Sequence, residues 1–372
     1  MNPLTIAIRV DASTQMGTGH IVRCLTIADN LQKYSVRVIF ICRILPGDWL
    51  SVLKERGFET ISLSSDVNRE EAWNSDRDAK LTVENLHQRQ LFPNWLIIDH
   101  YQIGQDWEIY LRPNVEKIMV IDDLANRSHD CNLLLDQNIY PGWMHRHNGL
   151  LPHHCQQLLG LKYLILRDEF RQYKFDRNTD IQCGHLKILL TFGGSDPSNL
   201  TEKVLLALDK IYRSNSNGKQ EIIIHVLLGK SYAVKTRLNE VIQSLPFETE
   251  VFTSVIRMIE HFEWADCAIS ASGLTTYELA YVGLPSLIIA AIGAQIEFAE
   301  ELSRLGIHRY AGFCDNLTIE QLISQIKDFL LNLSHAERIR CSLIDGYGTD
   351  RILSHLINLS EPFNTEVIDC ME

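Results

Sequence analysis

Short apolar runs alternate with stretches of helical periodicity along the first half of the chain. This βαβα rhythm is typical of a parallel sheet that helices cover on both faces. The apolar runs predict strands at 5–10, 36–42, 60–63, 95–99 and 117–122, with a shorter one at 132–135. The stretches between them predict helices at about 20–33, 48–56, 77–90 and 105–112. The pattern then dissolves from 137 to 160, where His, Pro, Gly and Trp are frequent.

A second βαβα series follows the polar stretch 171–184, which has almost no apolar periodicity. Its predicted strands are 186–192, 221–228, 249–252, 266–270 and 285–290. Its predicted helices are 199–212, 233–243, 255–262, 274–281, 295–305, 319–333 and a last one at about 351–359. We therefore expect an α/β fold of two Rossmann-like domains that face each other across a cleft. Their expected bounds are 1–170 and 185–372, with a linker at 171–184 and a last helix open to packing back on the first domain.

Composition excludes several classes of protein. The chain has 372 residues, of which 45% are hydrophobic and 22% charged, as in an ordinary soluble globular protein of two domains. Its net charge of −12 argues against nucleic acid as a partner. Nine scattered cysteines without a C-x-x-C pair fit reduced thiols and a cytoplasmic location. Neither a leader pattern nor an apolar run of membrane-spanning length is evident, so no membrane association is expected, and a monomer is favoured.

The first candidate site is the turn after the first strand. Gly17 and Gly19 bring His20 to the start of a helix, at the sheet edge where open α/β sheets bind ligands. A dinucleotide fingerprint would need a third glycine at position 22 and an acidic residue after the second strand, and the chain has neither. A simple tight turn would leave the neighbouring Arg9 and Asp11 unexplained. His20 is therefore a candidate base in a pocket.

The fourth predicted strand ends in Asp99-His100-Tyr101, at the same edge of the sheet as His20. Asp99 could orient a histidine, and Tyr101 could donate a hydrogen bond to a reacting oxygen. For this segment alone, a helix-capping Asp and a partly buried Tyr explain the pattern slightly better. The pair Asp122-Asp123 after the next strand is predicted to serve in capping or turns.

Two strand-to-helix turns in the second domain suit a diphosphate. Gly193, Gly194 and Ser195 follow one strand without the Gly-Lys-Ser/Thr of a Walker A loop. Glycine N–H groups, a serine hydroxyl and a helix N-terminus can nevertheless hold phosphate. An ordinary glycine turn is as good an explanation of this segment by itself.

The second of these turns follows the strand at 266–270. Ser272, Gly273 and Leu274 would present N–H groups to an anion, and Glu278 lies one helical turn further on, where a carboxylate can accept both hydroxyls of a ribose. The competing explanation is a helix cap with an exposed glutamate. A cluster of His145, His147, His153, His154 and Cys155 fits no standard zinc spacing, so no metal site is predicted.

Together these motifs resemble a known family. The first is Arg9-x-Asp11-x-Ser13-x-x-x-Gly17-x-Gly19-His20-x-x-Arg23-Cys24. The others are Asp99-His100-Tyr101, Leu159-Gly160-x-x-Tyr163-x-x-Leu166-Arg167-x-Glu169-Phe170, Phe192-Gly193-Gly194-Ser195-Asp196, Ser270-Ala271-Ser272-Gly273 and Asp345-Gly346-x-Gly348-x-x-Arg351-Ile352. In this order they resemble the UDP-sugar hydrolases of pseudaminic acid biosynthesis and their spore-coat polysaccharide relatives.

The resemblance implies a GT-B-like fold and hydrolysis of UDP-2,4-diacetamido-2,4,6-trideoxy-β-L-altropyranose to the free sugar and UDP. It implies that His20 is the base, that Tyr101 corresponds to the tyrosine after the fourth strand, and that Glu278 holds the ribose. From the residues themselves we expect Asp11 to assist catalysis. We also expect Arg9, Gly17, Gly19, Asp99, the residues of the two phosphate-binding turns and Gln295 to contact substrate. Relatives often carry Asn-Gln where this chain has Ala294-Gln295, which leaves the exact sugar open.

The chemistry expected from the residues needs only one catalytic base. A nucleoside diphosphate is a good leaving group, so one base that activates water can suffice where most glycosidases need two carboxylates. Water would attack the anomeric carbon with inversion, and neither a metal nor a cofactor is required. Three alternatives remain open: a GT-B glycosyltransferase with a UDP-sugar donor, a non-catalytic nucleotide-sugar binding module, and a hydrolysing 2-epimerase.

Overall fold

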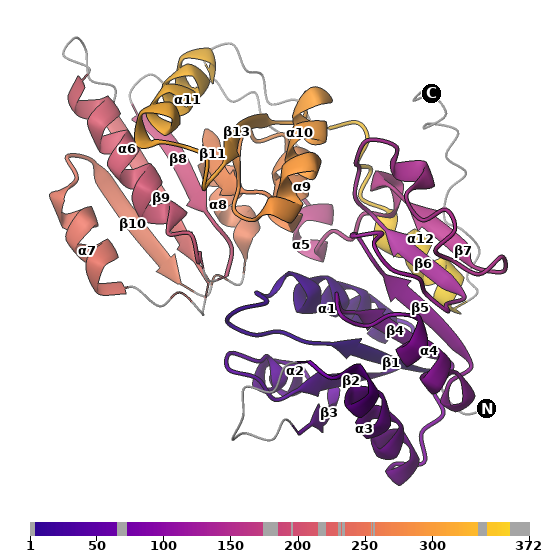
Figure 1. Cartoon of the computed structure of the whole chain (residues 1–372). Coiled ribbons are helices and arrows are strands. Elements are labelled where there is room, and N and C mark those ends of the chain that lie inside the picture. The colour runs from indigo at the N-terminus through magenta and orange to yellow at the C-terminus, as the bar shows by residue number, and fades with distance from the viewer. Residues whose placement is uncertain are drawn as a thin grey trace. The chain divides into compact units, whose positions relative to one another are not determined.

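The computed structural model describes residues 4–64, 73–173, 185–194, 196–214, 221–229, 232, 235–253, 255, 257–333 and 341–357. The chain divides into two compact units (Figure 1). Unit 1 comprises the residues up to Arg167 together with those from Asp345 onward, and unit 2 comprises Asp168–Ile344. None of the described helices is long and apolar enough to cross a membrane.

Unit 1 is built on a seven-stranded parallel sheet. Its strands are β1 (Thr5–Val10), β2 (Arg37–Arg43), β3 (Glu59–Leu63), β4 (Trp95–Asp99), β5 (Lys117–Ile121), β6 (Leu133–Asp136) and β7 (Gln156–Leu159), in the order β3-β2-β1-β4-β5-β6-β7. Its helices are α1 (Gly19–Gln32), α2 (Leu50–Glu55), α3 (Ser75–Gln88), α4 (Gln105–Leu111) and α12 (Gly348–Ile357), with short 3₁₀ turns η1 (Arg112–Asn114), η2 (Trp143–His145) and η3 (Leu161–Tyr163). The strand order reverses between β1 and β4, which is the position where open α/β sheets bind ligands.

Both faces of this sheet are buried, as its apolar strands require. On one face, Ile6 and Ile8 of β1 belong to a core with apolar residues of α1 and α12. On the other face, Ala7 belongs to a core with Trp107 of α4 and Leu86 of α3. The carboxyl end of β1 is therefore held rigidly between two packed layers.

The last helix belongs to unit 1; the expected bounds, 185–372, counted it with the second domain but left it open to packing back on the first. The Trp95 indole donates a hydrogen bond to the Leu356 carbonyl at 3.0 Å, and Arg351 donates one to the Lys162 carbonyl at 2.7 Å. A Cβ on Gly348 would lie 2.2 Å from the Leu164 carbonyl oxygen, so only glycine allows this approach. Most of the expected linker, 174–184, lies outside the described residues.

Unit 2 is built on a six-stranded parallel sheet in the order β10-β9-β8-β11-β12-β13. Its strands are β8 (His185–Thr191), β9 (Glu221–Leu228), β10 (Glu248–Thr253), β11 (Cys267–Ala271), β12 (Ser286–Ala290) and β13 (Arg309–Phe313). Its helices are α5 (Asp168–Arg171), α6 (Leu200–Ser214), α7 (Lys235–Ser244), α8 (Met258–Trp264), α9 (Leu274–Tyr281), α10 (Ile296–Arg304) and α11 (Ile319–Asn332), with the 3₁₀ turn η4 (Gly293–Gln295). The order reverses between β8 and β11. The predicted α/β class with two Rossmann-like sheets is confirmed.

Candidate functional site

His20 and Asp99 form the closest contact of the predicted site. Asp99 ends β4, and His20 is the second residue of α1, which follows the neighbouring strand β1. Their side chains meet at 2.6 Å, between His20 Nδ1 and Asp99 Oδ1, and both are buried. The structure therefore brings together two residues that are 79 positions apart in the sequence, at the point where the strand order reverses.

Arg23 holds the same carboxylate from a second direction. Its Nε donates to Asp99 Oδ2 and its Nη2 to Asp99 Oδ1, each at 2.6 Å. Burial alone would raise the pKa of Asp99, but Arg23 and His20 together hold that pKa well below its ordinary value. Asp99 is therefore a fixed negative charge against the histidine ring.

Tyr101 and Asp123 complete this group. The Tyr101 ring meets the His20 ring edge-on, with centroids 4.4 Å apart and planes at 84°. Asp123 Oδ2 accepts a hydrogen bond from Arg23 Nη1 at 3.0 Å, while its buried Oδ1 has no hydrogen-bond partner among the described residues. Burial, and then the negative charge of Asp123, raise the pKa of the Tyr101 phenol well above its ordinary value. The phenol therefore stays protonated and can donate a hydrogen bond.

Sequence reasoning missed Arg23 and Asp123 as site residues. Arg23 stands in the first motif but was given no role in the site. Its spacing of three positions from His20, which places both side chains on one face of α1, is the signal that could have found it. Asp122 and Asp123 were both expected in turns. Asp122 does accept hydrogen bonds from the N–H groups of Leu124 and Ala125, as that expectation requires. Asp123 instead contacts Arg23.

Arg9 and Asp11 form a separate, fully buried cluster. Arg9 Nη1 and Nη2 donate to Asp11 at 2.6 and 3.0 Å, and Nε and Nη2 donate to Asp78 at 3.1 and 2.6 Å. Arg9 Nη1 also lies 3.4 Å from the Ile41 carbonyl, so each of its nitrogens has a protein partner. In this structure Arg9 is 0% exposed and has no surface to present to a substrate.

Asp11 faces His100 rather than His20. Asp11 Oδ2 lies 3.3 Å from His100 Nε2, and the carboxylate also accepts the Arg43 backbone N–H at 2.8 Å and Arg43 Nε at 2.7 Å. Burial raises the pKa of Asp11, but Arg9 and His100 hold it well below its ordinary value. The two aspartates expected at the site thus serve different histidines: Asp99 contacts His20, and Asp11 contacts His100.

The turn between β1 and α1 is closed by its own backbone. Gly17 N–H donates to the Ser13 carbonyl at 2.9 Å, and Met16 N–H donates to Ser13 Oγ at 3.0 Å. Gly17 has φ of 77°, a left-handed conformation that favours glycine. Gly19 then begins α1, whose first turn contains no acidic residue. The start of α1 therefore keeps its partial positive charge beside His20.

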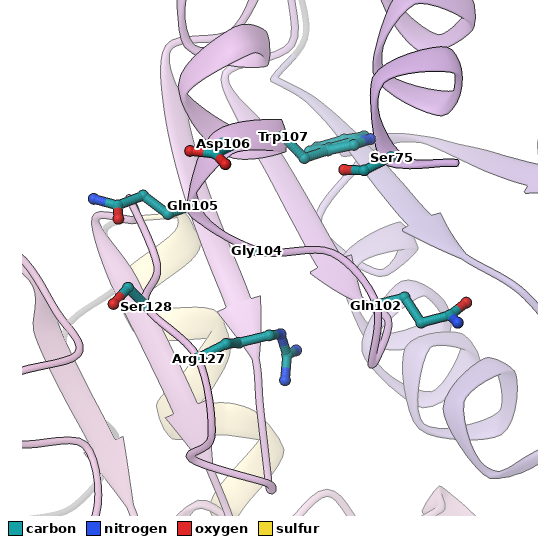
Figure 2. A pocket seen from close by; sticks show the side chains of 8 residues that line it. All are labelled: Ser75, Gln102, Gly104, Gln105, Asp106, Trp107, Arg127 and Ser128. Carbon is teal, nitrogen blue, oxygen red and sulfur yellow. The ribbon is translucent and has the colours of Figure 1, made fainter. Parts of the chain in front are cut away.

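His20 is not among the residues that line the pocket in Figure 2. The pocket has a volume of about 330 Å³ and is lined by Ser75, Gln102, Gly104, Gln105, Asp106, Trp107, Arg127 and Ser128. Arg127 already donates to the carbonyls of Ile103 and His100 and to Asp122. The Arg127 guanidinium is therefore already held by the protein, and the pocket lining contains no histidine that could act as a base.

In unit 2, the first predicted phosphate turn follows β8. Gly193 has φ of 85°, and a Cβ on Gly229 would lie 2.3 Å from Gly194 Cα, so the two loops touch through bare backbone. Ser195 lies outside the described residues. Asp196 accepts the N–H groups of Leu200 and Thr201 at 2.8 and 2.9 Å, and thereby caps α6.

The second turn follows β11, which pairs with β8, so the two turns lie at neighbouring strand ends. Ser272 N–H donates to the Ile289 carbonyl at 3.0 Å, and Gly273 N–H donates to Thr276 Oγ1 at 3.2 Å. The expectation that both N–H groups face an anion is therefore wrong in this structure, because the sheet and the helix cap use them. Of the atoms expected to bind an anion, Leu274 N–H remains, and the buried Ser272 hydroxyl has no partner among the described residues.

Glu278 and Gln295 lie near this second turn in the chain. Glu278 is 1% exposed, in the second turn of α9, and is not the exposed glutamate of the competing explanation. Gln295 Oε1 accepts the Ala291 N–H at 2.9 Å and so closes the loop after β12.

Among the described residues, no group of three or more His, Cys, Asp and Glu side chains is arranged to hold a metal ion. Within the cluster of histidines at 145–154, the His147 ring contacts the Asp136 carboxylate, with 3.1 Å between His147 Nε2 and Asp136 Oδ2.

No family model matches the chain. It is 28% identical to an uncharacterised protein of Methanocaldococcus jannaschii over 77% of this chain and 55% of that protein. It is 32% identical to the UDP-2,4-diacetamido-2,4,6-trideoxy-beta-L-altropyranose hydrolase of Campylobacter jejuni over 56% of this chain and 66% of the hydrolase. It is 28% identical to the spore coat polysaccharide biosynthesis protein SpsG of Bacillus subtilis over 54% of this chain and 58% of SpsG. The chain thus spans less than two thirds of each of these relatives.

Solved structures show the fold. The crystal structure of MurG from Acinetobacter baumannii matches 96% of this chain and 100% of MurG, with a TM-score of 0.63 and 13% identity. The S. aureus MnaA structure with UDP matches 97% of this chain and 100% of MnaA, with a TM-score of 0.59 and 12% identity. The chain therefore has a GT-B-like fold, as predicted.

Proposed function

We propose that this protein is a nucleotide-sugar hydrolase that releases UDP from UDP-2,4-diacetamido-2,4,6-trideoxy-β-L-altropyranose. The observation that carries the proposal is the 2.6 Å contact between His20 and Asp99 at the point where the strand order of unit 1 reverses. The named hydrolase of Campylobacter jejuni, similar over 56% of this chain, supports the choice of sugar. The UDP in the S. aureus MnaA structure, which has a similar fold, supports a uridine nucleotide as ligand.

In this proposal His20 is the general base. Asp99 accepts a hydrogen bond from the Nδ1–H of His20, which leaves the lone pair of Nε2 to take a proton from water. The water oxygen then bonds to the anomeric carbon while the bond from that carbon to the UDP oxygen breaks. UDP leaves with the electron pair, and the configuration at the carbon inverts. The ionised Asp99 stabilises the imidazolium that forms.

Arg23 and Tyr101 have supporting roles. Arg23 keeps Asp99 ionised and fixed in position, so it acts through the carboxylate and is a positioning residue. Tyr101 lies edge-on against His20 and stays protonated, so its hydroxyl can donate to an oxygen of the bound sugar. Arg9 and Asp11 are positioning residues as well, because their buried ion pair holds the carboxyl end of β1, from which the chain runs on to His20.

We assign the nucleotide to unit 2. The bare backbone at Gly193 and Gly194, the Ser272 hydroxyl and the Leu274 N–H would bind the diphosphate. Glu278 would accept the hydroxyls of the ribose. Gln295 would contact the sugar through the part of its carboxamide that does not hold the Ala291 N–H. This assignment needs neither a metal ion nor a cofactor.

The test is hydrolysis of a panel of UDP-diacetamido sugars with no acceptor present. We expect UDP release, a free sugar with the opposite anomeric configuration by proton NMR, and ¹⁸O from labelled water in the sugar. His20→Asn should lower kcat by about 100-fold or more, because general bases contribute about that much. The Kd for UDP, measured by calorimetry, should not change.

Other outcomes select the alternatives. Turnover only after an acceptor alcohol is added would identify a glycosyltransferase, and a changed configuration at the second sugar carbon would identify a hydrolysing epimerase. Binding of the UDP-sugar without turnover would identify a binding module. Label in UDP rather than in the sugar would show cleavage at phosphorus and would refute the proposed attack on carbon.

A further inference from the structure

Two cysteines of unit 1 lie in sulfur contact. Cys131 precedes β6 and Cys155 precedes β7, and their Sγ atoms are 3.5 Å apart. The two strands are parallel neighbours, and the Gln156 N–H donates to the Asn132 carbonyl at 3.0 Å beside the pair. Cys131 is fully buried, whereas Cys155 is partly exposed. A solvent-borne reagent can therefore reach one sulfur of the pair and not the other.

The surroundings favour a thiolate at the exposed position. The hydrogen bond from the Cys131 thiol, followed by the positive charge of His129, lowers the pKa of Cys155 against the opposing effect of burial. Burial lowers the pKa of His129, but Asp122 and Glu108 outweigh this effect and raise the pKa to about 9. His129 is therefore a cation at neutral pH. Burial raises the pKa of Cys24 and of Cys42, so neither favours a thiolate. The hydrogen bond to Cys155, and then burial, raise the pKa of Cys131 as well, so Cys155 is the thiol that attacks first.

We propose that Cys155 and Cys131 form a thiol–disulfide exchange site whose substrates are low-molecular-weight disulfides such as oxidised glutathione. The proposal rests on the sulfur contact, on the unequal exposure of the two thiols and on the cation beside them. It is independent of the proposed hydrolysis, because the pair lies at the amino ends of β6 and β7, whereas His20 and Asp99 lie at the carboxyl ends of strands in the same parallel sheet.

The exchange proceeds in two balanced steps. The Cys155 thiolate attacks one sulfur of oxidised glutathione, forms a mixed disulfide and expels a glutathione thiolate. Cys131 Sγ then attacks Cys155 Sγ while its proton passes to the departing glutathione sulfur, so the second glutathione leaves as a thiol. The two cysteines are oxidised and one glutathione disulfide is reduced to two thiols. The sulfurs must approach by about 1.5 Å to reach the bond length of about 2.0 Å.

The test uses the full chain, fully reduced and then held in glutathione buffers of increasing oxidised fraction at neutral pH. Free thiols are blocked with iodoacetamide, and the protein is digested and mapped by mass spectrometry. We expect a peptide cross-linked through Cys131 and Cys155, and its reversal by dithiothreitol. Cys131→Ser should trap the glutathione adduct on Cys155, at least about tenfold above wild type, because the resolving thiol is gone.

Cys314→Ser is the matched control, because Cys314 is also a buried free thiol, and it should leave the cross-link unchanged. Circular dichroism establishes that each variant is folded. If wild type shows no Cys131–Cys155 cross-link, or cross-links other cysteines equally, the proposal fails whatever the variants do. It also fails if folded Cys131→Ser carries no adduct on Cys155.

Discussion

Arg23 meets Asp99 side-on, with Nε and Nη2 of the guanidinium each 2.6 Å from a different carboxylate oxygen. The same Asp99 oxygen that accepts Nη2 also contacts His20 Nδ1 at 2.6 Å. A planar group with two parallel donors fixes both the position and the rotation of the carboxylate. The orientation of the His20 ring is therefore set by a residue one helical turn away on the same helix.

Arg23→Lys should separate position from charge. Lysine keeps the positive charge but replaces the two-point contact with a single ammonium, so Asp99 can rotate. We expect kcat for UDP release to fall about 10- to 100-fold, as for other residues that orient a catalytic ligand, with little change in KM. Arg56→Lys is the control, because Arg56 makes an exposed ion pair with Asp29. Equal kcat values for the two variants would contradict the positioning role.

Tyr101→Phe removes a hydroxyl and keeps the ring that contacts His20. If the phenol donates to an oxygen of the sugar, kcat should fall by about tenfold, roughly the value of one lost hydrogen bond. Tyr110→Phe, at an exposed tyrosine on α4, should have no effect. Stopped assays of UDP release measure both. An unchanged kcat for Tyr101→Phe would assign Tyr101 to packing alone.

Arg9→Met should affect stability. The substitution leaves the carboxylates of Asp11 and Asp78 buried without their common cation, and removing one partner of a buried ion pair costs about 3–5 kcal/mol. Arg37→Met breaks the exposed pair with Glu59 and should cost less than about 1 kcal/mol. Urea unfolding of both variants gives the comparison. A cost for Arg9→Met as small as that of the control would mean that the cluster is not the support we infer.

The fold was predictable because buried parallel strands are continuous apolar runs. The two strands that the pattern missed, β7 and β13, lie at the edges of their sheets, where one side is exposed. β7 begins with the exposed Gln156 and Gln157, and only one residue of β13 is buried. An edge strand needs few apolar residues, so β7 and β13 did not stand out from loops, although the other two edge strands, β3 and β10, were predicted.

The site was predictable up to the point where contacts depend on the sheet register. Polar residues at the ends of two strands predicted that His20, Asp99 and Tyr101 share an edge. The sequence suggested Asp99 as the partner of a histidine, but it could not show that Asp11 contacts His100 rather than His20. Nor could it show that the N–H of Ser272 is used by the adjacent strand, since that depends on pairing with β12.

His129 should make stability depend on pH. It is 1% exposed, and Glu108 and Asp122 outweigh the effect of burial and raise its pKa to about 9. An unfolded histidine has a pKa of about 6.5, so the folded state binds the proton more tightly. The resulting stabilisation is fully present below pH about 6.5 and is lost as pH rises through about 9, and it amounts to about 3 kcal/mol.

Urea unfolding under reducing conditions, at several pH values from 6 to 9, measures how the free energy of unfolding depends on the His129 proton. This range covers the unfolded pKa of about 6.5 and the folded pKa of about 9. Wild type should lose free energy of unfolding across the window. His129→Gln should be less stable at the acid end and should lose the part of the slope that comes from this proton. His87→Gln, at an exposed histidine on α3, should keep the wild-type slope. Identical slopes for wild type and His129→Gln would show that Glu108 and Asp122 do not hold the proton on His129.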